Sequence, residues 1–168
     1  MHKAPLFDLD KISVFIFDFD GVLTDNIVFI DQNGIESVAC SRADGLAFDI
    51  LHRLKKKSYI LSTEKNQVVE ARAKKLKIPV IQGINNKVNA LKELKKEEGI
   101  NFKSALYMGN DLNDYHAMQL CGISVCPADS HPKIKEISDI VLKTNGGNGV
   151  VRELLEDILG LDFVKILY

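Results

Sequence analysis

The sequence has little excess charge and few aromatic residues, and this scarcity argues against one class of partner. Its 22 lysines and arginines are balanced by 23 aspartates and glutamates, the formal net charge is -1, and aromatic residues make up only 7% of the chain. Surfaces that bind nucleic acids depend on clustered cations, because these neutralise the phosphate backbone. We therefore expect no nucleic-acid partner.

Cysteines and long apolar runs are also scarce. The three cysteines, Cys40, Cys121 and Cys126, lie in or beside apolar segments and show no metal-ligand spacing. This usage indicates reduced core thiols in a cytoplasmic protein. No apolar run approaches the roughly 20 residues of a membrane-spanning helix, and no secretory signal pattern stands at the N-terminus. We therefore expect a cytoplasmic location and no membrane partner.

Apolar, β-favouring runs alternate with amphipathic helical patterns along the 168 residues, which predicts one domain over 1–168. Strands are expected at 12–17, 58–62, 79–82, 105–108, 123–126 and 140–142. Helices are expected at 42–57, 66–76, 86–98, 111–120 and 131–137, with a last helix opened by 146–149 and ending at 159. Parallel neighbours need crossover connections, so the predicted fold class is α/β, a Rossmann-like parallel sheet with helices on both faces. Two short β-favouring runs around the Asn-Gly of 31–34 predict an inserted β-hairpin at about 26–39.

The most informative stretch is Phe15–Asp25, which reads F-I-F-D-F-D-G-V-L-T-D. Residues i and i+2 of a strand project to the same side, so Asp18 and Asp20 hold two like charges close together at the strand tip. A hard cation such as Mg²⁺ relieves that repulsion, because it binds carboxylate oxygens. The plainer alternative is a strand that ends in a solvated acidic turn.

The string resembles the first motif of the haloacid dehalogenase superfamily of aspartate-nucleophile phosphatases, and three further motifs follow in the family's order. The resemblance implies that Asp18 attacks phosphorus and that Asp20 acts as acid and base. It implies that Ser62 and Lys87 hold the phosphate, although alone they would be a strand-end cap and a surface lysine. The expected cofactor is Mg²⁺, held by the set Asp18, Asp20, Asp111 and Asp114. Of these, Asp20 would bind through its backbone carbonyl, and Asp114 would complete the shell or stand behind it; a simple helix cap is the alternative for Asp111.

The gaps between the motifs leave no room for a cap domain. This capless layout, with G-G-N-G-V-V-R-E at 146–153, is similar to phosphatases of 3-deoxy-octulosonate 8-phosphate and of nonulosonate 9-phosphates. In that family hairpins assemble a tetramer whose subunits close one another's sites, which implies a homotetramer here. The apolar hairpin and the tail 161–168 are accordingly expected to be contact surfaces, with a tail folded back on its own sheet as the alternative.

The second motif, S-T-E-K-N at 62–66, resembles the nonulosonate-type members and the similar domains found beside acylneuraminate cytidylyltransferases. The resemblance implies that the substrate is a 2-keto-3-deoxy sugar-acid phosphate, with the nine-carbon type favoured and the eight-carbon type next. The residues expected to contact it include Thr63, Glu64, Arg72 and Lys75. Thr63 stands where the family has Gly, and Asn110 stands where an Asp is frequent. A second hypothesis is a weakly active regulatory subunit of a CMP-sugar acid synthesis system.

Overall fold

The computed structural model describes residues 7–168. Its centre is a six-stranded sheet in the order β5-β4-β1-β6-β7-β8. All neighbouring strands in this sheet are parallel. The strands are β1 (Val14–Phe17), β4 (Lys57–Leu61), β5 (Val80–Ile81), β6 (Ala105–Met108), β7 (Ile123–Cys126) and β8 (Ile140–Val141). This arrangement confirms the predicted α/β class.

Strand β1 lies in the middle of the sheet, and all four of its residues are buried. It pairs with β4 on one side and β6 on the other, and its last residue, Phe17, is opposite Ile60 and Met108. Because the strands are parallel, the residues that follow them meet at one edge of the sheet. The backbone pairing of the strands alone thus brings the predicted motifs close together.

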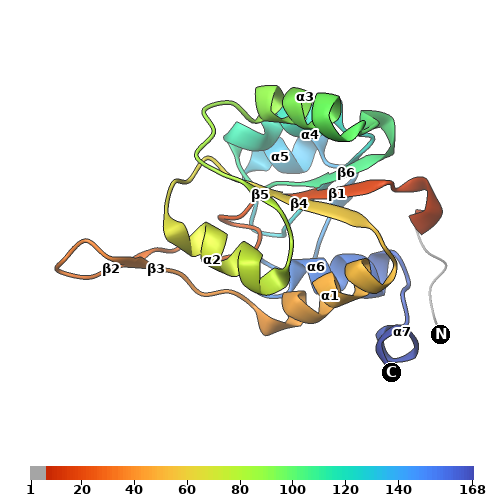
Figure 1. Cartoon of the computed structure of the whole chain (residues 1–168), viewed down its shortest axis with the longest axis horizontal. Helices are drawn as coiled ribbons and strands as arrows, with labels where there is room; N and C mark the ends of the chain where they lie inside the picture. The colour runs from red at the N-terminus through yellow and green to blue at the C-terminus, as the bar shows by residue number, and fades with distance from the viewer. Residues whose placement is uncertain (1–6) are drawn as a thin grey trace.

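Helices cover both faces of the sheet (Figure 1). One face carries α1 (Arg42–Arg53), α2 (Gln67–Leu76) and α6 (Val150–Glu153), and the other carries α3 (Lys87–Glu98), α4 (Tyr115–Leu120) and α5 (Pro132–Ile137). Each layer packs on its own apolar cluster, the first around Phe17 and Phe48 and the second around Ile16 and Tyr107. No helix within 7–168 is long and apolar enough to cross a membrane.

Several boundaries differ from the expected ones for local reasons. The helix expected at 42–57 ends at Arg53, because Lys55 adopts a left-handed backbone conformation that no helix continues through. The helix expected at 111–120 is divided into a 3-10 turn, Leu112–Asp114, and α4. The last helix continues beyond α6 as a π-helical turn, Leu154–Ile158. The other 3-10 turns are Leu9–Lys11 and Phe102–Ser104.

The predicted hairpin is present and projects away from the body of the molecule (Figure 1). Its strands are β2 (Phe29–Ile30) and β3 (Glu36–Ser37), paired antiparallel. Asp31 closes the turn, because its carboxylate accepts the backbone N–H groups of Asn33 and Ile35. Phe29 and Ile30 are 61% and 67% exposed, so the hairpin presents apolar side chains to the outside.

The C-terminal tail corrects one expectation. It forms the short helix α7 (Phe163–Leu167), which packs beside α1, and Phe163 is buried in the apolar cluster of its own chain. The guanidinium of Arg152 lies 4.6 Å from the centre of the Phe163 ring. The tail is therefore folded back on its own domain, and Val164 and Tyr168 are its large apolar side chains left exposed for contact with another chain.

Candidate active site

A cavity of about 300 Å³ lies at the carboxyl edge of the sheet. It receives side chains from the loops after β1, β4 and β6, which carry the first motif, the second motif and the fourth motif, G-N-D-L-N-D at 109–114. Its lining consists of Asp18, Asp20, Asn26, Ser62, Thr63, Asn110, Asp111, Leu112 and Asn113. Most of the predicted site residues are in this wall or directly beside it, and Lys87 reaches it through an ion pair described next.

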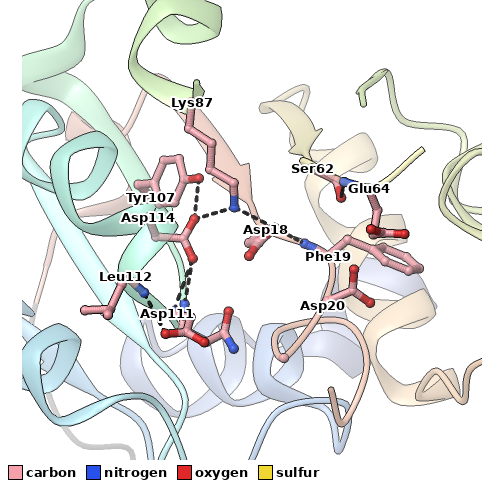
Figure 2. Close-up of polar contacts among 12 residues, drawn as sticks. Asp18, Phe19, Asp20, Ser62, Glu64, Lys87, Tyr107, Asp111, Leu112 and Asp114 are labelled. Carbon is pink, nitrogen blue, oxygen red and sulfur yellow. Dashed lines mark hydrogen bonds and ion pairs between the residues drawn. The ribbon is translucent and has the colours of Figure 1, made fainter. Parts of the chain in front are cut away.

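Asp18, Lys87 and Asp114 form a buried charged cluster (Figure 2). The Lys87 ammonium lies 2.8 Å from Asp18 Oδ1 and 2.6 Å from Asp114 Oδ1, and all three side chains are nearly inaccessible. Asp18 Oδ1 also accepts the backbone N–H of Phe19 at 2.7 Å. Two buried carboxylates around one buried ammonium leave an excess negative charge when both are ionised. Such an excess favours a further cation.

The titration of this cluster follows from its burial. Burial raises the pKa of Asp18, the charge of Asp114 raises it further, and Lys87 offsets these effects only in part, so the net pKa stays well above its ordinary value. Burial by itself lowers the pKa of Lys87, but the attraction of Asp18 and Asp114 exceeds that effect, and the net pKa is raised. Lys87 is therefore a permanent positive charge beside the predicted nucleophile.

Asp114 stands behind the cavity. Its Oδ1 accepts the hydroxyl of Tyr107 at 2.8 Å as well as the Lys87 ammonium, and its Oδ2 accepts the backbone N–H of Asn110 at 3.0 Å. A side chain at Gly109 would place its Cβ 2.5 Å from Asp114 Cγ, so only glycine fits there. Of the two positions foreseen for Asp114, the geometry favours the one outside the metal shell, where its carboxylate holds the loop of the fourth motif.

Asp20 occupies the other side of the cavity. The Thr24 hydroxyl donates to Asp20 Oδ1 at 3.4 Å. Burial raises the pKa of Asp20, and the nearby negative charge of Glu64 raises it further. A carboxyl that keeps its proton to higher pH is suited to proton donation in a reaction.

The second motif follows β4 directly. Ser62 is buried, and its Oγ accepts the backbone N–H of Glu64 at 3.1 Å, so the hydroxyl proton is available to a ligand. Thr63 lines the cavity and Glu64 is exposed beside it. Figure 2 shows Ser62 and Glu64 on the opposite side of Asp18 from Asp114.

The structure does not bring Arg72 and Lys75 to this cavity. Both lie on the side of α2 that faces α1, where they line a separate cavity of about 490 Å³ together with Arg42 and Asp49. The Arg72 guanidinium donates to the backbone carbonyl of Ser41 at 2.7 Å. The expectation that they contact the same ligand as Asp18 is therefore not met within one chain, because helix packing turns them into the crevice between α1 and α2.

Asn110 lines the cavity, although the sequence had assigned it no role in the site. The residue is 8% exposed, and its Oδ1 is buried with no hydrogen-bond donor within residues 7–168. The sequence signal was its place directly after the β6–Gly109 segment, in a position where the family often has an acid. Because hard cations take amide and carboxylate oxygens alike, an Mg²⁺ ion fits this oxygen. Asp18, Asp20, Asn110 and Asp111 line this cavity, although no three His, Cys, Asp or Glu side chains among residues 7–168 are grouped as a metal site, and Asp111 Oδ1 already accepts the N–H of Leu112.

The chain is similar over most of its length to known phosphatases and hydrolases. The 3-deoxy-D-manno-octulosonate 8-phosphate phosphatase of Escherichia coli K12 is 33% identical over 151 residues, which cover 89% of this chain and 80% of the relative. A solved structure from Streptomyces avermitilis, described as a HAD family hydrolase, is 42% identical with a TM-score of 0.90, covering 94% of this chain and 97% of that one. The 3-deoxy-D-manno-octulosonate 8-phosphate phosphatase of Moraxella catarrhalis, solved with magnesium, phosphate and a KDO molecule, is 33% identical with a TM-score of 0.84, covering 89% and 86%.

The family model that matches residues 41–154 describes a haloacid dehalogenase-like hydrolase. The family model matches more than half of the chain. The two solved structures above share the fold of this chain over most of their length. The chain therefore belongs to the haloacid dehalogenase-like hydrolases.

Proposed function

We propose that this protein is a Mg²⁺-dependent phosphatase of 2-keto-3-deoxy sugar-acid phosphates. The observation that carries the proposal is the buried carboxylate of Asp18 at the cavity, 2.8 Å from the Lys87 ammonium. A carboxylate held this way is a nucleophile next to a positive charge that suits phosphoryl oxygens. The similarity to two octulosonate 8-phosphate phosphatases supports the substrate class.

The residues divide the reaction into two steps. Within residues 7–168, both protein contacts of the Asp18 carboxylate go to Oδ1, which leaves Oδ2 as the attacking oxygen. As Oδ2 bonds to phosphorus, the bond from phosphorus to the substrate oxygen breaks, and Asp20 donates its proton to that oxygen. Asp20 then takes a proton from water, whose oxygen attacks the aspartyl-phosphate, releases phosphate and restores Asp18.

Charge is controlled by the residues around the phosphoryl group. Lys87 and the Ser62 hydroxyl hold its oxygens, and Asp114 keeps Lys87 in place. Asp18, the backbone carbonyl of Asp20, Asn110 and Asp111 are the proposed ligands of the cation. When bound, Mg²⁺ supplies positive charge between the nucleophile and the phosphate, which would otherwise repel each other.

The finer proposal is a preference for nonulosonate 9-phosphates, and it rests on Glu64. This carboxylate lies close enough to Asp20 to raise its pKa, so the mouth of the cavity is acidic there. An acidic group accepts hydrogen bonds from sugar hydroxyls, whereas an arginine would attract a substrate carboxylate. We expect Glu64→Arg to shift the ratio of kcat/KM toward 3-deoxy-octulosonate 8-phosphate, and an unchanged ratio in the folded variant would assign the preference to other residues.

The proposed assembly is a homotetramer in which a neighbouring chain completes each site. A cavity open to water weakens its internal electrostatic contacts, and a covering subunit would strengthen them. In such an assembly Arg72 and Lys75 would bind the substrate only if it extends from the Asp18 cavity along α2. The cytoplasmic location remains a prediction from composition.

The proposed function is tested by measuring phosphate release from 3-deoxy-octulosonate 8-phosphate, nonulosonate 9-phosphates and common sugar phosphates. The assay is run with Mg²⁺ and with EDTA, for the wild type and for Asp18→Asn. We expect Mg²⁺-dependent release from the keto-sugar acid phosphates by the wild type alone. Release no faster than that of Asp18→Asn on every substrate would favour a binding or regulatory subunit instead.

A further inference from the structure

The glycine-rich segment 146–149 takes no part in the proposed reaction, yet it lies against the turn that follows Asp20. We propose that Gly146 and Gly147 form a positioning element that sets the place of the Asp20 carboxyl. The inference rests on the proposed function, since it assumes that Asp20 transfers a proton. It gives the glycine-rich segment 146–149 a structural role in the proposed reaction.

The two backbones are in direct contact. The Gly147 N–H donates to the carbonyl of Val22 at 2.9 Å. A Cβ on Gly146 would lie 2.1 Å from the carbonyl oxygen of Gly21, and one on Gly147 would lie 2.4 Å from the backbone nitrogen of Asp25. Because the obstructing atoms are backbone, a larger residue cannot be accommodated by rotation of a side chain. Gly147 also has a φ of +74°, which disfavours other residues.

Thr24 connects the turn to the Asp20 carboxylate by hydrogen bonds. The Thr24 side chain is fully buried, and its hydroxyl accepts the backbone N–H groups of Gly21 at 3.3 Å and Asn26 at 3.2 Å. The same hydroxyl donates to Asp20 Oδ1. A displacement of the backbone at Thr24 therefore moves the group that orients the Asp20 carboxylate.

One carboxylate binds the glycine segment directly, and two others bind the residues on either side of it. Asp129 accepts the Gly146 N–H at 2.9 Å, and Glu153 accepts the N–H groups of residues 143 and 144 at 2.9 and 2.8 Å. Asp44, which is 1% exposed, accepts the N–H of the second residue of α6, immediately after the segment. Held from several elements, the segment is a rigid surface for the turn.

The chemistry predicts a particular defect when this surface changes. A misplaced Asp20 cannot protonate the leaving oxygen, so esters of poor leaving groups suffer most. A displacement of about 1 Å costs on the order of 10²-fold in rate. We expect Gly147→Ala to lower kcat for the sugar-acid phosphate by about that factor, with KM nearly unchanged. Hydrolysis of p-nitrophenyl phosphate, whose leaving group departs without a proton, should fall much less.

Gly99→Ala is the matched control. Gly99 has a φ of +68°, close to that of Gly147, but no atom of residues 7–168 lies within 4 Å of the place that a Cβ would take there, and it caps α3 away from the Asp20 turn. Both variants bear the cost of alanine in a left-handed conformation. Only Gly147→Ala should change the ratio of kcat for the sugar-acid phosphate to kcat for p-nitrophenyl phosphate.

A second measurement is independent of activity and of metal. Hydrogen exchange of the metal-free chains, followed by mass spectrometry, should show faster exchange of residues 19–26 in Gly147→Ala than in Gly99→Ala, because the turn loses its support. If Gly147→Ala does not fold, Asp129→Ala replaces it, since Asp129 is exposed and anchors Gly146. Asp129→Ala should also speed the exchange of residues 19–26 and change the ratio of kcat for the two substrates. Both effects should be smaller than those of Gly147→Ala.

The inference is overturned if the folded Gly147→Ala, or Asp129→Ala in its place, matches Gly99→Ala in both exchange and substrate ratio. A wild-type chain that releases no phosphate from any substrate is a different result. It would refute the proposed function, while the exchange data alone would still show whether the glycine segment supports the turn.

Discussion

Asp18 illustrates how a single residue combines two opposing demands. Its burial disfavours the carboxylate form, whereas a nucleophile has to be ionised. Lys87 at 2.8 Å and the Phe19 N–H both favour the carboxylate form, although they offset the effect of burial on the pKa only in part. The cluster thus stabilises the charged form of Asp18 only in part, and a bound cation would favour that form further.

We predict that Asp18→Asn loses on the order of 10⁴-fold or more in kcat, because the amide cannot attack phosphorus. The fold should persist, since Lys87 keeps its ion pair with Asp114 at 2.6 Å. Phosphate release and thermal unfolding measure the two effects. Activity well above background in the folded variant would remove Asp18 from this role.

Asn110 gives a prediction about the cation. Its buried Oδ1 has no donor within the described residues, so Asn110→Ala should remove an oxygen ligand and raise the Mg²⁺ concentration for half-maximal activity about tenfold or more. Asn113→Ala is the control, because Asn113 lines the same cavity but is exposed. Equal Mg²⁺ requirements in the two variants would exclude Asn110 from the metal shell.

At the scale of elements, the helices on one face of the sheet are connected through the C-terminal tail. Helix α7 packs beside α1, and Phe163 lies against both the apolar cluster and Arg152 of α6. A tail that only met a neighbouring subunit would affect substrate binding more than stability. The packing of Phe163 reverses that expectation.

Phe163→Ala should therefore lower the free energy of unfolding by about 3–5 kcal/mol, the usual cost of truncating a buried aromatic side chain. Val164→Ala, next to it and 72% exposed, should change it by less than about 0.5 kcal/mol. Denaturant unfolding measures both values. Similar small losses in the two variants would mean that the tail contributes little to the domain.

For the whole molecule, the hairpin is the feature that a single chain does not explain. Its apolar side chains, Ile27, Phe29, Ile30 and Ile35, are each more than half exposed. Exposed apolar groups beside unpaired strand edges invite association. The hairpin is consequently the surface through which we propose that the tetramer forms.

Ile30→Asp should dissociate the assembly and lower activity, because it places a charge in the proposed interface. Val141→Asp is the control, since Val141 is 45% exposed on β8, away from the hairpin. Sedimentation over a wide dilution range, with activity assayed in parallel, separates the outcomes. A wild-type monomer with full activity would refute the shared site.

The local patterns of the sequence determined the sheet, the hairpin and the main acids of the site. The strand period and the crossover helices predicted a parallel α/β sheet, and the spacing of Asp18 and Asp20 placed both carboxylates at one strand end. The Asn-Gly dipeptide predicted the hairpin turn. These features depend on backbone geometry over a few residues, which is why the sequence alone contained them.

Contacts between distant segments were decided only by the tertiary structure. Helix packing turned Arg72 and Lys75 into the crevice beside α1 and folded Phe163 onto its own chain. The enclosure of Asn110 Oδ1 and the contact of Gly147 with the turn after Asp20 likewise depend on loops from separate strands. The spacing of residues along the chain does not give the distance in space between distant segments, because that distance is set by how the whole core packs.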